Sequence, residues 1–87
     1  MNLDKARKEI DKIDIKIINL ISKRQTYLPM IAKYKRENNL KIVQLDRERQ
    51  AIDTRVKIAL RLGVSEKLVS EIFKKIFRNS VKIQREI

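Results

Sequence analysis

Apolar residues in the first forty positions recur at the spacing of three and four that marks one face of an α-helix. The apolar positions on this face are Leu3, Ile10, Ile17, Ile21, Leu28 and Ile31. The pattern predicts one long helix from Leu3 to about Asn38. We expect it to bend near Pro29, because proline lacks a backbone N–H and its ring clashes with the carbonyl four residues earlier.

Two shorter helices are predicted to follow. One runs from about Gln44 to Leu62 and stops at Gly63, a residue that readily takes the left-handed conformation at a helix end. The other begins after Ser65, a good N-cap, and continues past Ile83. One Gly and one Pro leave little material for hairpins, so we expect an all-α fold with residues 1–87 forming a single helical domain of one long and two shorter helices.

The length of the first helix bears on assembly. At about 1.5 Å per residue it would be roughly 50 Å long, whereas a globule of this chain length has a radius of gyration of about 12 Å. The two shorter helices cannot cover such a helix, so a symmetric homodimer is the expected way to bury the rest of its apolar face. A monomeric three-helix bundle with a fraying long helix is the alternative.

Polar residues interrupt the apolar faces of all three helices. They are Arg7, Asp14, Arg24 and Lys35 in the first helix, Glu48 in the second, and Ser80 and Gln84 in the third. Arg24 and Lys35 are eleven residues apart and therefore share a helix face. Arg7 lies roughly 25 Å from Arg24 along the same helix, so both cannot reach one small ligand from one chain. In an antiparallel dimer, Arg7 could approach the site of the other subunit.

Two interpretations of these inward charges remain open, since burying an unpaired charge costs several kcal/mol. In the first, Glu48 and Asp14 neutralise Arg24 and Lys35 in an internal network. In the second, the helices enclose a pocket for a small dianion that carries hydroxyl groups. Arginine suits a carboxylate through its two parallel N–H groups, lysine supplies a compact charge, and Glu48 could accept from a hydroxyl.

Composition narrows the chemistry further. The chain has 22 Lys+Arg against 11 Asp+Glu, a formal net charge of +11, which suits an anionic partner. It has no Cys and no His, which excludes disulfides, thiolate catalysis, Cys/His metal sites and an imidazole base. No apolar run is long enough to span a membrane and no signal peptide is evident, so we expect a cytoplasmic protein without a membrane partner.

Several segments together carry a family resemblance. They are residues 6–14 (ARKEIDKID), 20–24 (LISKR), 31–35 (IAKYK), 46–48 (DRE) and 72–76 (IFKKI), followed by Asn79, Ser80 and Gln84. Their order and spacing over essentially the whole chain resemble the all-helical (type II) chorismate mutase family. The resemblance implies an intertwined homodimer with two shared active sites, each completed by an arginine from the partner's first helix.

The resemblance also implies roles for individual residues. Arg24 and Arg7 of the partner subunit would bind the two substrate carboxylates, and Lys35 and Gln84 would meet the ether oxygen. Glu48 would hold the C4 hydroxyl, and Arg47 and Ser80 would complete the lining. The family usually has Asp one helical turn before this Glu, where the chain has Gln44, so a neutral amide is expected at that contact.

The implied reaction is the rearrangement of chorismate to prephenate in aromatic amino-acid biosynthesis, catalysed by an isomerase that needs no metal and no cofactor. The nearest rival is isochorismate pyruvate lyase on a similar scaffold, and a mutase acting on an amino analogue of chorismate is another. A basic helical nucleic-acid-binding module is a rival of a different class; against it, no helix-turn-helix or zinc signature is present and the most informative cations face inward. A purely structural dimerisation module has no need for Ser80 and Gln84 on an apolar face.

Overall fold

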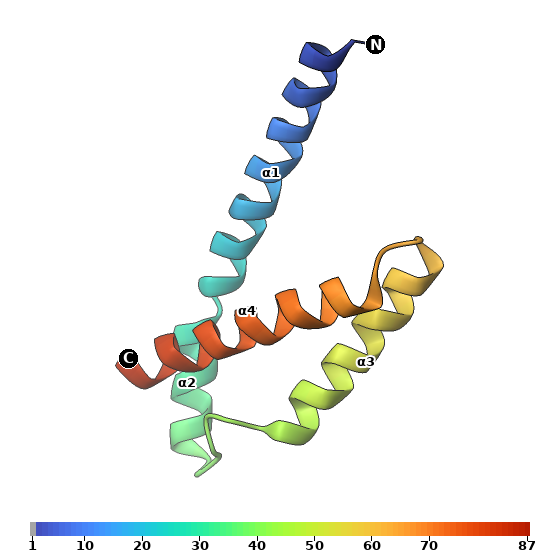
Figure 1. Ribbon diagram of the computed structural model, residues 1–87. Coiled ribbons are helices and arrows are strands. Elements are labelled where there is room, and N and C mark those ends of the chain that lie inside the picture. Colours follow the sequence, from blue (N-terminus) through green and yellow to red (C-terminus); the bar gives the residue numbers. More distant parts are fainter. Residues whose placement is uncertain (1) are drawn as a thin grey trace.

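The first predicted helix appears as two consecutive segments in the computed structural model, which describes residues 2–87 (Figure 1). Helix α1 spans Leu3–Gln25 and helix α2 spans Leu28–Glu37. Asn2 caps α1, because its side-chain oxygen accepts a hydrogen bond from the backbone N–H of Lys5 at 2.9 Å. The helical range therefore matches the sequence prediction.

The junction of α1 and α2 corrects one detail of that prediction. A bent but continuous helix was expected, whereas Thr26 and Tyr27 form a turn between the two segments. Their N–H groups donate to carbonyls three residues earlier, at 3.2 Å each, and Pro29 lies in the first turn of α2. Proline is tolerated there but cannot continue the ladder of the preceding helix. Because Thr26 and Tyr27 keep right-handed helical dihedrals, α2 continues in the general direction of α1 (Figure 1).

The two remaining helices agree with the prediction to within one residue at the termini it specified. Helix α3 spans Leu45–Arg61 and α4 spans Glu66–Glu86. Gly63, with φ of 70°, reverses the chain between them, and the Ser65 hydroxyl caps α4 by accepting from the backbone N–H of Leu68 at 3.1 Å. Asn39, with φ of 55°, turns the chain after α2. Residues 2–87 contain helices joined by turns and short irregular segments, with no strand, which confirms the all-α class for that range.

Packing is uneven along the chain. Helix α4 packs against both α3 and α2, whereas most of α1 projects away from the other three helices (Figure 1). No residue of α1 is buried. Elsewhere in residues 2–87, the buried apolar side chains are Leu28, Ala32, Ala51 and Ala59. The radius of gyration is 16.1 Å, well above the roughly 12 Å of a compact chain of this length.

None of the helices in residues 2–87 combines the length and apolar character needed to cross a membrane.

Candidate active site

A cavity of about 250 Å³ lies where α2, α3 and α4 meet the last turn of α1. Seven of the eight residues to which the sequence assigned a role line it: Arg24, Lys35, Gln44, Arg47, Glu48, Ser80 and Gln84. Leu28, Ile31, Ile42, Ala51 and Val81 supply apolar lining. Residues up to sixty positions apart in sequence thus share one small space, and their roles toward a ligand stay predictions.

Lys35 and Gln84 form the best-defined pair in the cavity. Lys35 Nζ donates to Gln84 Oε1 at 2.8 Å and to the carbonyl oxygen of Ile42 at 2.7 Å. Gln84 is buried, as its place on the apolar face of α4 predicted. With its oxygen held by Lys35, the Gln84 amide has its NH₂ group left to donate into the cavity, and Lys35 has one N–H left. Burial lowers the pKa of Lys35 and the nearby Glu48 carboxylate raises it, the burial effect being the larger.

Arg24 and Ser80 form a second pair. Arg24 Nη1 donates to Ser80 Oγ at 3.4 Å, and the Ser80 hydroxyl donates to the carbonyl oxygen of Ile76 at 3.0 Å. The guanidinium carbon of Arg24 lies 5.9 Å from the ring centre of Phe77, a distance at which the ring face attracts a cation. Ser80 is buried, as predicted, and the carbonyl of its own helix orients its hydroxyl. The Ser80 hydroxyl thus acts as a hydrogen-bonding group between Arg24 and the backbone of α4.

The first turns of α3 supply the remaining predicted residues. Glu48 and Gln44 are half-buried at the cavity, and Arg47 is exposed at its edge. Gln44 occupies the N-cap position of α3 without a side-chain capping bond, so its amide remains available to a ligand. Gln44 and Glu48 are one turn apart on the same face.

Charges in the cavity are not balanced within the chain. Four cations line it, and Glu48 is the single carboxylate. The salt bridges within residues 2–87 are Lys12–Glu9, Lys33–Glu37, Arg49–Asp46 and Lys57–Asp53, all along exposed helix faces. Neither Glu48 nor Asp14 forms a salt bridge with Arg24 or Lys35 within that range, although Glu48 is close enough to raise the pKa of Lys35. One carboxylate cannot balance four cations, so an internal network neutralises them only in part. An unbalanced cation cluster around a small cavity is suited to an anion.

One of the four cations, Arg55, was missed by the sequence analysis. It lies seven residues after Glu48, two helical turns along the same face of α3, and it lines the cavity. Its guanidinium carbon is 5.0 Å from the ring centre of Phe73 and 5.7 Å from that of Phe77. The spacing of seven residues from Glu48 could have indicated that Arg55 lies on the same face of α3.

Arg7 is the predicted site residue that does not reach the cavity. It is exposed on α1 and, at about 1.5 Å per residue, lies some 25 Å from Arg24 along that helix. The single chain therefore leaves one of the predicted carboxylate-binding residues outside the site.

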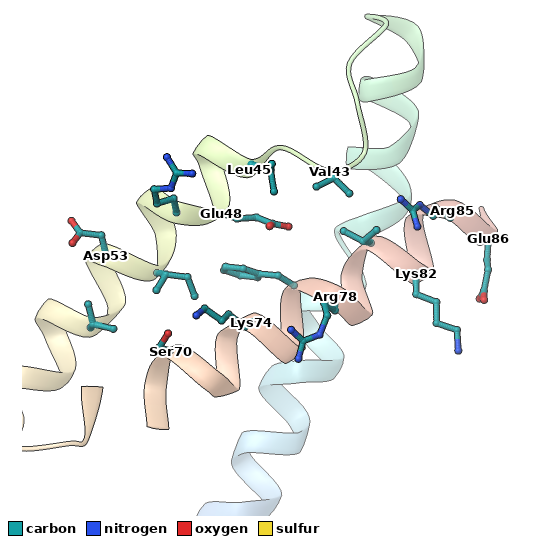
Figure 2. A pocket seen from close by; sticks show the side chains of 15 residues that line it. Val43, Leu45, Glu48, Asp53, Ser70, Lys74, Arg78, Lys82, Arg85 and Glu86 are labelled. Atoms are coloured by element: carbon teal, nitrogen blue, oxygen red, sulfur yellow. The ribbon is translucent and has the colours of Figure 1, made fainter. Parts of the chain in front are cut away.

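A larger groove of about 1,120 Å³ runs between α3 and α4 on the other side of Glu48 (Figure 2). Leu45, Ile52, Val56, Phe77 and Val81 give it an apolar lining. Glu48 reaches into the space between the helices, and Lys74 and Arg78 line the α4 side (Figure 2). The groove shares Glu48, Phe77 and Val81 with the smaller cavity, so it opens directly beside the candidate active site.

The cavity can hold a small, oxygen-rich dianion without covalent chemistry. Arg24 and Lys35 offer charged donors from different helices, Gln84 offers a buried amide, and Glu48 can accept from a hydroxyl. No three His, Cys, Asp or Glu side chains of residues 2–87 are grouped as a metal site would require. The arrangement suits a reaction that depends on positioning and on stabilising negative charge.

The fold and the cavity define an all-helical protein with a cation-rich polar site built from helix side chains. The family described as "Chorismate mutase type II" matches residues 6–85, and the chain belongs to that family.

Relatives support the assignment at low identity. The chain is 28% identical over 81 residues to the "Bifunctional chorismate mutase/prephenate dehydratase" of Buchnera aphidicola, covering 93% of this chain and 21% of the relative. It is 30% identical over 78 residues to the "T-protein" of Haemophilus influenzae, covering 90% and 21%. It is 29% identical over 84 residues to the "Chorismate mutase" of Methanocaldococcus jannaschii, covering 97% and 85%. The chain thus spans about a fifth of the length of the first two relatives and most of the third.

Proposed function

We propose that the chain is a chorismate mutase, which rearranges chorismate to prephenate within a homodimer that has two shared active sites. One C–O bond breaks and one C–C bond forms within the same molecule, so the substrate and product are isomers and no proton, electron pair or group is exchanged with the protein. Family membership supports this proposal. The observation that carries it is the Lys35–Gln84 pair, held at 2.8 Å and facing a cavity with excess positive charge.

The proposed mechanism divides the cavity into two tasks. Arg24, with Ser80 beside it, binds one carboxylate and holds the flexible substrate in its reactive conformation. Lys35 and the free NH₂ of Gln84 donate to the ether oxygen, on which negative charge grows as the C–O bond breaks. Lys35 is held by the loop carbonyl of Ile42 and by Gln84, and Gln84 is held by Lys35, so little reorganisation is needed when the charge develops.

Glu48 and Gln44 complete the proposed substrate contacts from α3. The Glu48 carboxylate accepts from the C4 hydroxyl, and the Gln44 amide takes the place where the family usually has a second carboxylate. Arg47, exposed at the edge of the cavity, adds positive charge for the incoming dianion.

A homodimer is part of the proposal for two reasons. The apolar stripe of α1 is open to solvent in the single chain, with Ile10 and Ile17 54% and 51% exposed. The groove between α3 and α4 is lined with apolar side chains and lies beside the cavity. A second copy of α1 seated near this groove would cover both surfaces and bring Arg7 of the partner subunit to the second carboxylate.

The direct test is turnover by the purified protein. Chorismate absorbance should fall in its presence, and the product should be prephenate. Pyruvate released from isochorismate, without prephenate from chorismate, would assign the site to the lyase. Steeply salt-dependent binding to arbitrary duplex DNA, with neither turnover, would instead favour a nucleic-acid-binding module.

A further inference from the structure

Arg55 has no assigned task in the proposed mechanism, yet it lines the same cavity as Arg24. It is half-buried on α3, and its long side chain folds back over the preceding turn. Its Nη1 donates to the carbonyl oxygen of Ala51 at 3.0 Å.

Two aromatic rings of α4 hold this guanidinium in place. The ring centres of Phe73 and Phe77 lie 5.0 and 5.7 Å from the guanidinium carbon of Arg55, and the two ring centres are 6.1 Å apart. Arg24 approaches the same Phe77 ring at 5.9 Å. The ring of Phe77 therefore brings two arginines, from α1 and α3, to one part of the cavity. A planar guanidinium held against aromatic faces keeps its N–H edge free for a carboxylate.

Arg55 also lacks a counter-charge. No carboxylate of residues 2–87 lies within salt-bridge distance of it, and Ala51 takes one of its five N–H donors. Burial lowers the pKa of Arg55, and Arg47 and Arg24 lower it further. Burial and two neighbouring cations thus disfavour the charge of Arg55, and a bound anion would favour it.

We propose that Arg55 is a substrate-binding residue, whose guanidinium binds the same carboxylate as Arg24. This inference rests on the proposed function for the identity of the dianion. Arg55 then contributes ground-state affinity: its contact goes to a carboxylate whose charge does not change during the rearrangement, so it acts on KM and spares kcat.

The test compares Arg55→Gln and Arg55→Met with Arg61→Gln. Arg61 is an exposed arginine near the end of α3 that lines neither the cavity nor the groove, so its replacement by Gln removes the same charge from the same helix. Losing a charged hydrogen bond to the carboxylate should raise the KM for chorismate about tenfold in both Arg55 variants, with kcat within about threefold. Arg55→Lys should recover part of the loss. Arg61→Gln should leave KM within about twofold of the wild type.

A purely structural role for Arg55 predicts another result. Because Met keeps an unbranched apolar stem against Phe73 and Phe77, a packing role would leave Arg55→Met with wild-type KM. Wild-type KM in this variant would overturn the proposal, and so would wild-type KM in a folded Arg55→Gln.

A second readout separates this inference from the proposed function. Malonate, a small dicarboxylate, should raise the Tm of the wild type and of Arg61→Gln but raise that of Arg55→Met much less. If chorismate is not turned over, the proposed function fails and the malonate comparison alone decides. Equal malonate shifts in Arg55→Met and the wild type, or none in the wild type, would then overturn the role of Arg55.

Discussion

Helices α1 and α4 are similar in length and both are amphipathic, but they pack differently within the chain. Helix α4 packs against α2 and α3, whereas most of α1 projects away and its last turn meets α4 through Arg24 and Ser80. Both have polar residues inside their apolar stripes. On α4, Ser80 and Gln84 meet Arg24 and Lys35 from the same chain and are buried. On α1, Arg7 and Asp14 remain exposed.

Polar residues inside an apolar stripe thus have two different environments in this chain. Where helices pack in one chain, the polar residues become the lining of a cavity. Along most of α1, nothing in residues 2–87 covers the stripe: Leu3, Ile10 and Ile17 are exposed, and Ile21, near the last turn, is half-buried. The difference suggests a division of labour in which the packed helices carry most of the chemistry and α1 carries the assembly of the proposed dimer.

The largest expected effect comes from removing a charge on the packed side. Lys35→Ala should lower kcat about 10²- to 10³-fold, because in the proposed mechanism it takes away a positioned donor to the ether oxygen. The dimer should stay intact, since Lys35 lies in the cavity of its own chain. Steady-state kinetics and analytical ultracentrifugation would measure the two properties separately.

Lys33→Ala is the matched control, because Lys33 is an exposed lysine two positions away on the same helix. Its kcat should equal that of the wild type. Wild-type kcat in Lys35→Ala would refute the site assignment.

The next largest effect tests whether the exposed apolar stripe of α1 forms the interface of the proposed dimer. The double change Ile10→Glu and Ile17→Glu places two carboxylates in the exposed apolar stripe of α1 and should raise the dimer Kd about a hundredfold or more. Sedimentation velocity over a range of concentrations would show monomers. Circular dichroism should still show a helical chain, since α1 packs little within it.

Lys16→Glu makes the same change in net charge on the polar face of α1 and should leave the dimer intact. If the Ile10/Ile17 variant sediments like the wild type, the stripe does not form the interface and α1 has another role.

A smaller effect on activity is expected from mixing a variant of α1 with a variant of the packed helices. Arg7→Ala and Lys35→Ala should each be nearly inactive, but a mixture that exchanges subunits should regain activity. Half of the dimers are mixed, and one of the two sites in each has both residues, so about a quarter of wild-type activity is expected. Absence of recovery after verified subunit exchange would show that Arg7 does not act in the partner's site.

The packed region was more predictable from sequence than the rest. The ranges of α3 and α4 follow from their stripes, from Gly63 and from the Ser65 cap, which are local signals. Ser80 and Gln84 could be predicted to face inward because they continue an apolar face. The break between α1 and α2 could not, because a proline inside a helical pattern is compatible with a bend or with an interruption.

Arg55 and Arg7 show two further limits. The sequence places Arg55 on a face of α3, but its side chain reaches the cavity by folding back one turn and stacking on rings of another helix. Such a path depends on packing that the spacing of residues does not encode. For Arg7, no information within one chain determines what it touches.

The smallest expected effect concerns the pH dependence of Lys35. Because burial lowers its pKa below the ordinary value of 10.5, the neutral amine forms at a lower pH than in a free lysine. In the proposed mechanism the ether oxygen needs the ammonium form, so kcat/KM should fall as pH rises through this lowered pKa, before pH 10.5 is reached. The ratio kcat/KM reports the free protein, in which this pKa applies.

Glu48 gives this prediction a sharper form. Its carboxylate raises the pKa of Lys35, so Glu48→Gln should move the alkaline fall of kcat/KM to lower pH, beside any loss of activity from the hydroxyl contact. Asp53→Asn, which removes an exposed carboxylate from the same helix, should leave the position of the fall unchanged. A profile that stays flat through pH 10.5 in the wild type would mean that the charge of Lys35 is not needed for turnover, and the packed helices would lose their central catalytic group.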